Sequence, residues 1–278
     1  MNKIKISSFN KLIISSIVIL FSFLFYLSVP ALYDYERVQK QIKSELLSKF
    51  NLNIEISKKI KYRILPSPHF EIIDSKLFSN SENDPIVIGD IKNSKIFVSI
   101  NNLHNQKYLN VKEVVFSKSL FNFNKKNIQF LNNNFKIKKD DRNISIKKSK
   151  FFFRDKDKTI AIFPISNLKF FYNKKKSLNV VNLNGVAFNS KFSSNIIKEF
   201  EKEKKINFVL KLPAANLSVK NVLSNISNVE NKFNSLTIVN FLGSEIKTES
   251  DFSNNLLKFS SKKSKVLNNN LKYSGSIN

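Results

Sequence analysis

The chain has 278 residues, and 47 Lys and Arg against 21 Asp and Glu give it a net charge of +26. It contains no cysteine, which excludes disulfides, thiolate metal sites and a cysteine nucleophile. After one membrane span is set aside, the remaining length suffices for one large domain or two small ones.

The positive charge does not by itself indicate a nucleic-acid partner. Arginine, the side chain best suited to base edges and bidentate phosphate contacts, is found only at Arg37, Arg63, Arg142 and Arg154. Lys, Asn, Ile, Phe and Ser are abundant together, as AT-rich codon usage would produce. We therefore expect most lysines on solvated faces, and attraction to anionic lipid head groups is the first alternative. A nucleic-acid partner is not expected.

Residues 1–11 form a basic tail with Lys3, Lys5 and Lys11, and residues 12–30 form a candidate transmembrane anchor. Leu12–Val29 contains no charge, and as a helix it would span roughly 27 Å, close to the hydrocarbon thickness of a bilayer. The basic flank predicts a cytoplasmic N-terminus and an exported remainder. The alternative is a cleaved signal peptide, which has a shorter apolar core and a small-residue cleavage site.

Residues 31–50 are predicted to hold an amphipathic helix over about 34–49. Asp34 is suited to the N-cap, and an apolar residue recurs every four positions. This stripe consists of Val38, Ile42, Leu46 and Phe50. The helix is predicted to pack on the domain that follows, and the alternative is that it lies along the membrane surface.

Residues 51–278 are predicted to form a periplasmic domain of short strands, because apolar and polar residues alternate between polar turns. The predicted strands are Asn53–Ser57, Ile60–Leu65, His69–Asp74, Lys76–Phe78, Ser94–Ile100, Val111–Phe116, Ile128–Phe130, Phe135–Lys138, Ile144–Lys147, Lys150–Arg154, Thr159–Phe163, Leu168–Tyr172, Val180–Asn184, Val186–Phe188, Ile206–Leu212, Leu217–Lys220, Leu236–Val239, Leu256–Ser260 and Leu271–Ile277. Two segments with helical spacing, Ser194–Lys205 and Val222–Val229, are predicted as helices. The spacing of the strands suits an antiparallel meander.

Such a meander must cover its apolar face. A sandwich or a closed barrel would do so, and so would a curved sheet whose trough is filled by acyl chains. Glycine is available for tight corners only at Gly89, Gly185, Gly243 and Gly275, which favours the open trough. The predicted fold class is therefore mainly β, with an N-terminal transmembrane helix, one short amphipathic helix, and a long curved antiparallel meander forming a groove. About 16 strands at roughly 4.8 Å predict a groove of about 75 Å.

Residues suited to catalysis are scarce. The only histidines, His69 and His104, have no partner at metal-ligand spacing, and the pair Asp140 and Asp141 has the character of a turn. No nucleophile elbow or phosphate-binding glycine loop is found in the sequence. We expect no enzyme activity, no cofactor and no metal site.

Three stretches resemble the AsmA family of Gram-negative envelope proteins. The first is the anchor running into Tyr33–Val38 and the helix through Phe50. The second is Ile60–Leu77, with its Leu-Pro-Ser-Pro segment, and the third is the Pro-x-x-Asn-Leu phrase within Leu212–Leu217. Typical members are considerably longer, so the resemblance implies a short or truncated member.

The resemblance implies a protein anchored in the inner membrane that extends through the periplasm as a twisted β-groove related to chorein-type bridge-like lipid-transfer proteins. Its implied role is phospholipid transport toward the outer membrane, with effects on outer-membrane assembly and with other envelope proteins as further partners. No catalytic residues are carried over. The alternative function is a scaffold with a closed, packed sheet that helps assemble outer-membrane components without carrying lipid.

The predicted lining of the groove takes aromatic and aliphatic residues from alternating strand positions. These are Ile96, Val98, Val114, Phe116, Phe135, Ile137, Phe151, Phe153, Phe170 and Tyr172. Lysines near the rim are expected to hold phosphate head groups as point charges.

Overall fold

The computed structural model describes residues 8–56, 59–78, 86–101, 103–105, 109–124, 143–155, 158–199, 205–225, 232–253 and 256–278. The chain begins with the apolar helix α1 (Ser8–Ser28), a short 3-10 turn η1 (Val29–Leu32) and the helix α2 (Tyr35–Phe50). The described strands after α2 all belong to one sheet of 16 strands.

The strands are, in chain order, β1 (Asn53–Ile56), β2 (Ile60–Arg63), β3 (His69–Phe78), β4 (Val87–Val98), β5 (Val111–Ser117), β6 (Leu120–Phe123), β7 (Asn143–Asp155), β8 (Lys158–Asn173), β9 (Leu178–Ala187), β10 (Ser190–Glu199), β11 (Lys205–Leu212), β12 (Leu217–Asn225), β13 (Lys232–Phe241), β14 (Ser244–Ser253), β15 (Leu256–Val266) and β16 (Asn269–Ile277). A 3-10 turn, η2 (Pro213–Ala215), joins β11 to β12. The fold class predicted from the sequence, mainly β with two N-terminal helices, is confirmed.

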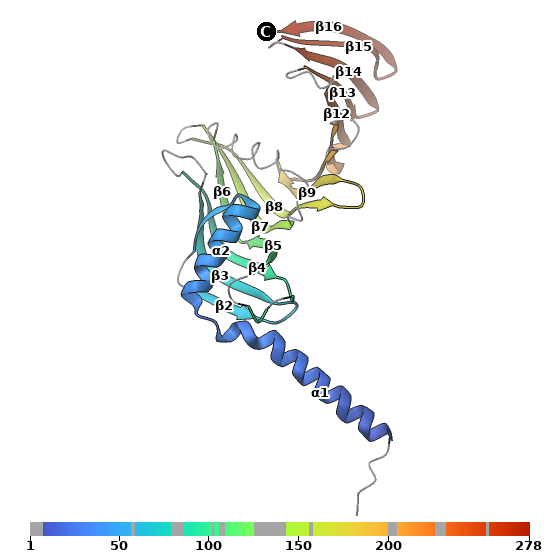
Figure 1. Ribbon diagram of the computed structural model, residues 1–278. Coiled ribbons are helices and arrows are strands. Elements are labelled where there is room, and N and C mark those ends of the chain that lie inside the picture. Colours follow the sequence, from blue (N-terminus) through green and yellow to red (C-terminus); the bar gives the residue numbers. More distant parts are fainter. Residues whose placement is uncertain are drawn as a thin grey trace, which may run out of the picture.

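The sheet is long, open and curved. Fourteen strands follow one another from β1 to β16, while β2 pairs with β3 and β6 pairs with β4 and β7 at the side of this path. Figure 1 shows the sheet running away from α1, with the C-terminus at the opposite end of the molecule. Thirteen spacings of ~4.8 Å give a path of roughly 60 Å, shorter than the predicted 75 Å.

The prediction of a purely antiparallel meander is wrong at one place. Strands β5 and β6 are two halves of one extended segment, and both pair with β7 in parallel. Alternation of apolar residues reports which face a side chain takes, and it carries no information on the direction of the neighbouring strand. The predicted strands Ile128–Phe130 and Phe135–Lys138 fall in the connection before β7 and lie outside the described residues.

The two predicted helices in the second half of the chain are also wrong. Of their described residues, 194–199 lie in β10, Lys205 begins β11 and 222–225 lie in β12. The helical spacing came from Ile197 and Phe200 in the first segment and from Val222, Leu223, Ile226 and Val229 in the second. In β10 the adjacent residues Ile196 and Ile197 point to opposite faces of the sheet, and both remain partly exposed. Strands β6 and β14 were missed, β14 because acidic residues and lysine dominate its sequence.

Helix α2 packs on the sheet, as predicted, with its apolar stripe fully buried. Val38, Ile42 and Leu46 are 0% exposed and Phe50 is 1% exposed. They join a core cluster with residues of β1, β3, β4, β5, β6 and β7. The Asp34 carboxylate accepts a hydrogen bond of 3.0 Å from the Glu36 amide at the start of the helix. These contacts leave the stripe unavailable for a membrane surface.

A line of irregular residues crosses the sheet from β3 to β8. Asp74, Lys118 and Lys148 have positive φ, and the pairing of β7 with β8 skips Lys148 and Ser166. At each irregularity the side chains that follow switch to the other face of the sheet, as they do after a β-bulge. Buried serines lie next to these irregular residues, at Ser75, Ser94, Ser119 and Ser149. Side chains an odd number of positions apart, such as Ile146 and Phe151, therefore face the same core.

Three tyrosines fasten the end of α1 to the sheet. The Tyr26 hydroxyl donates to the Ile100 carbonyl at 2.9 Å, and the Tyr62 hydroxyl donates to the Leu27 carbonyl at 2.6 Å. The Tyr33 hydroxyl donates to the Leu103 carbonyl. Burial, and to a smaller extent the neighbouring Tyr33, raises the pKa of Tyr62 to about 12. The helix and the sheet therefore meet at a defined, partly buried junction.

Adjacent leucines in α2 test the packing of this helix. Leu46→Ala is expected to lower the free energy of unfolding by about 2–5 kcal/mol, because it leaves a cavity in the core. Leu47 is 49% exposed, so Leu47→Ala is expected to cost less than about 1 kcal/mol. Denaturant unfolding of the full chain in detergent measures both, and equal losses would contradict the packing described here.

The Tyr62 junction predicts a loss of stability at high pH. Because the pKa of Tyr62 is raised to about 12 in the folded chain, its contribution is complete below the ordinary tyrosine value of about 10. That contribution is lost as the pH rises from 10 to 12. The unfolding midpoint of the native chain should therefore fall more steeply over this range than that of Tyr62→Phe, and parallel pH profiles would contradict the assignment.

Candidate functional site

One face of the sheet, here named the α2 face, is apolar along most of its length. Residues directly opposite each other on neighbouring strands share a face, so the register traces this face from strand to strand. One row consists of Phe70, Ile96, Val114, Ile144, Phe170, Val181, Ile196 and Phe208. A second row consists of Phe116, Ile146, Leu168, Leu183, Ser194, Leu210, Val219, Val239 and Ile246. Two apolar rows therefore run from the first strands to β11, interrupted by Ser194, and the second row alone continues to β14, because Phe208 is followed by Asn221, Thr237 and Thr248 in the first.

Only the first part of the α2 face is covered. Ile96 and Val114, which lie under α2, are 0% exposed. In the described chain after Ala187, the fully buried residues are serines only, and Ile196, Phe208 and the other apolar residues there remain partly exposed. From β10 onward the same face thus offers apolar area that no described helix covers.

A ladder of phenylalanine rings joins the covered part of the α2 face to the open part. The ring centroids of Phe121 and Phe116 are 6.5 Å apart, and the ring centroid of Phe151 is 5.2 Å from those of both Phe121 and Phe123. The ladder continues from Phe123 to Phe153 at 5.5 Å, from Phe153 to Phe163 at 5.4 Å and from Phe163 to Phe192 at 6.5 Å. Most of these contacts are edge-to-face or tilted, as aromatic pairs prefer.

Glycines in the strands make room for this aromatic surface. Gly89, Gly185 and Gly275 lie opposite Phe121, Phe192 and Phe259, respectively. A Cβ on Gly185 would lie 2.9 Å from the Phe192 ring and 2.6 Å from the Pro164 carbonyl oxygen. Of the four glycines available for tight corners, Gly243 is used in one, in the turn between β13 and β14, where its φ is +78°.

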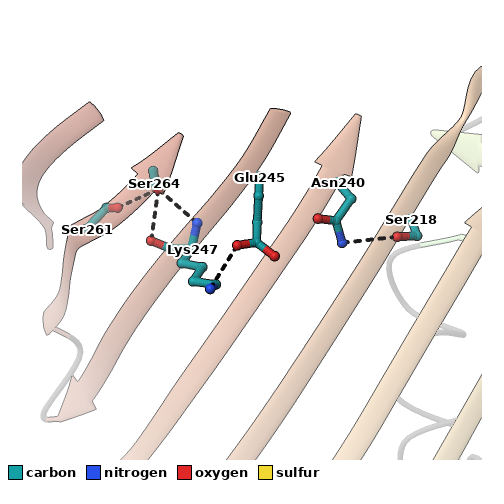
Figure 2. A network of polar contacts seen from close by, with 6 residues as sticks. All are labelled: Ser218, Asn240, Glu245, Lys247, Ser261 and Ser264. Carbon is teal, nitrogen blue, oxygen red and sulfur yellow. Dashed lines mark hydrogen bonds and ion pairs between the residues drawn. The ribbon is translucent and has the colours of Figure 1, made fainter. Parts of the chain in front are cut away.

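The opposite face carries hydrogen bonds and ion pairs between neighbouring strands. Figure 2 shows the Asn240 amide donating to the Ser218 hydroxyl at 3.4 Å and the Lys247 ammonium 2.8 Å from the Glu245 carboxylate. At the bulge in β15, the Ser264 hydroxyl accepts from the Lys247 amide at 2.8 Å, and Ser264 precedes Lys265, which pairs with Glu245. The α2 face of the C-terminal strands also carries a hydrogen bond, from the Asn221 amide to the Thr237 hydroxyl at 2.8 Å. In β14 the two faces differ in charge, because Glu245, Lys247, Glu249 and Asp251 all lie on the opposite face.

The eight described residues of the predicted lining all lie on the α2 face. Ile96, Val98, Val114 and Phe116 are at most 4% exposed because α2 covers them, so the prediction that they line an open groove is wrong for the folded chain. Phe151, Phe153, Phe170 and Tyr172 are partly exposed. Phe135 and Ile137 lie outside the described residues.

The prediction missed the open surface on β9 to β14. The missed residues of the α2 face include Leu183, Ile196, Phe208, Leu210, Val219 and Val239. The alternation of apolar and polar residues within β11 and β13 could have identified these residues. In β10 the same alternation was overlooked, because the segment was predicted as a helix.

Other groups suited to chemistry do not form a competing centre. His69 is 1% exposed and its Nδ1 lies 2.7 Å from the Ser67 carbonyl oxygen. Within the described residues, no three His, Asp or Glu side chains converge as metal ligands. A cavity of about 460 Å³ is lined by acidic and basic side chains, among them Asp74, Asp90 and Lys92. The Lys92 ammonium lies 2.7 Å from the Asp74 carboxylate, so these charges neutralise each other.

Comparisons of the chain with known protein families, with curated proteins and with solved structures give no match.

The two ends of the phenylalanine ladder are expected to differ in their contribution to stability. Phe121 is 3% exposed, so Phe121→Ala should lower the free energy of unfolding by about 3–5 kcal/mol. Phe192 is partly exposed, so Phe192→Ala should cost about 1 kcal/mol. Denaturant unfolding of both variants measures the difference. A large loss at Phe192 would show that the open part of the α2 face is packed against another part of the chain.

Proposed function

We propose that this protein is a membrane-anchored, periplasmic lipid-binding and lipid-transfer protein of the AsmA type, which contributes to phospholipid transport and outer-membrane biogenesis. The observation that carries the proposal is the continuity of the α2 face. It starts at the core beside the membrane-spanning candidate α1 and continues, uncovered, along strands that lead away from it.

Acyl chains match this surface chemically. Contiguous exposed apolar area is rare on soluble proteins and indicates an occupant of similar polarity. The α2 face offers aliphatic and aromatic rows without strong charge, along which a flexible hydrocarbon chain can lie without losing specific hydrogen bonds. A head group at the edge of the sheet stays in water, where lysines near the rim are expected to act as point charges.

The N-terminal sequence supports the same assignment. Phe9–Leu32 is long and apolar enough to cross a membrane, and Lys11 at its start favours a cytoplasmic N-terminus. The resemblance to the AsmA family covers the anchor, α2 and β2 to β3. The alternative function, a scaffold that carries no lipid, was expected to have a closed and packed sheet, whereas this sheet is open.

Two adjacent isoleucines allow a matched test of lipid binding. Ile196 lies on the α2 face between Val181 and Phe208, and Ile197 lies on the opposite face between Val180 and Asn207. The full chain, in detergent with a phospholipid that carries a photoreactive group in its acyl chain, is irradiated and its labelled peptides are mapped by mass spectrometry. Ile196→Glu should reduce labelling of β8 to β11 at least about tenfold, because a carboxylate is placed against hydrocarbon.

The control variant Ile197→Glu should keep this labelling within about twofold of the native chain. Labelling of α1 serves as the internal standard, because it should be the same in all three proteins. Labelling restricted to α1 in the native chain would overturn the lipid-carrier proposal and favour the scaffold.

A further inference from the structure

The junction between α1 and the sheet shows how deep the base of the sheet lies relative to the bilayer. Counting from Lys11, a hydrocarbon core of about 30 Å takes about 20 helical residues, which reaches residue 31 or so. The part of α1 that is exposed on all sides, however, ends at Phe25. Tyr26 is partly covered, and Leu27 is only 6% exposed. The last turn of the membrane-spanning segment therefore lies against protein.

The protein that contacts this turn consists of strand β2 and the loop after β4, at one end of the sheet. The Tyr26 hydroxyl binds the Ile100 carbonyl at 2.9 Å, just after β4, and the Leu27 carbonyl binds the Tyr62 hydroxyl at 2.6 Å, in β2. Tyr26 lies about 22 Å along the helix from Lys11, which is inside the hydrocarbon thickness. Tilting of the helix would place still more of it inside.

The loops after β2 and β4 carry exposed apolar side chains at this depth. Leu65 follows Tyr62 by three residues, within about 10 Å of chain, and is 79% exposed. Ile100 is 39% exposed. In water such side chains have no partner, whereas at the boundary between acyl chains and head groups they are stabilised by burial. Lys61 and Arg63, on the exposed side of β2, are placed to approach lipid phosphates.

We propose that Leu65 and Ile100, together named the basal rim, are inserted into the outer leaflet of the bilayer that α1 spans. The basal rim is a second membrane contact, separate in sequence from the anchor, and it holds the sheet at a fixed height and direction relative to the membrane. This inference rests on the proposed membrane anchoring of α1. It does not depend on lipid binding by the α2 face.

The test uses single cysteines, because the native chain has none. Leu65→Cys and Ile100→Cys are each labelled with an environment-sensitive fluorophore and reconstituted as full chains in phosphatidylcholine–phosphatidylglycerol vesicles that contain acyl-chain nitroxide lipids. Ile17→Cys, in the middle of α1, is the positive control. Leu267→Cys, in the turn between β15 and β16 and 69% exposed, is the matched exposed leucine at the far end of the sheet.

Insertion predicts nitroxide quenching at positions 65 and 100 of at least half that at position 17, with less than a tenth of it at position 267. Quenching at position 17 without quenching at 65 and 100 would overturn the basal rim and leave the anchor intact. Absence of quenching at position 17 would overturn the membrane anchor and the rim with it. Equal quenching at 65, 100 and 267 would indicate adsorption of the whole sheet to the vesicles and would also overturn the inference.

Discussion

The rest of the structure depends on the burial of one helical stripe against one end of a sheet. Val38, Ile42, Leu46 and Phe50 supply the side chains that turn the first strands into a packed core. Burial of four such residues stabilises the fold by roughly 1.5–3 kcal/mol each relative to exposure. Without α2 the β3 to β7 part of the sheet would expose its apolar residues, as the later strands do.

This constraint divides the sheet into a covered part and an open part with one continuous surface. The phenylalanine ladder crosses the boundary from Phe116, 1% exposed, to the partly exposed Phe192. An open sheet of this kind is held together by its backbone ladders and by cross-strand pairs. Gly185 under Phe192 and Gly275 under Phe259 show one such device, in which a missing side chain lets a ring lie close to the neighbouring backbone.

The same end of the molecule combines the packed core with the helix that is long and apolar enough to cross a membrane. Two tyrosine hydroxyls join α1 to the protein at the base of the sheet, through Tyr26 with Ile100 and Leu27 with Tyr62, and a third joins Tyr33, just after η1, to Leu103. A helix fixed in a bilayer would therefore also fix the direction in which the sheet extends. For a protein proposed to carry lipid away from a membrane, this orientation is as important as the chemistry of the carrying surface.

The sequence alone determined the elements whose signal is local. The uncharged run Leu12–Val29, the four-residue period of α2 and the alternation in strands such as β11 each predict their own structure, because the pattern and the structure span the same few residues. Alternation also predicted a sheet with one apolar face, and it left open whether a sandwich, a barrel or an open trough would cover that face; the scarcity of glycine favoured the trough.

Features that depend on contacts between residues far apart in the sequence were decided only by the tertiary structure. The parallel pairing of β7 with β5 and β6, the reversal of alternation at Lys148 and the covering of Ile96 and Phe116 by α2 all arise from contacts between separate parts of the chain. Alternation predicted the face that these residues share and could not show which part of that face a helix would occupy. The choice between core and open surface follows from where α2 ends, because beyond Phe50 the chain has no further described helix to place against the sheet.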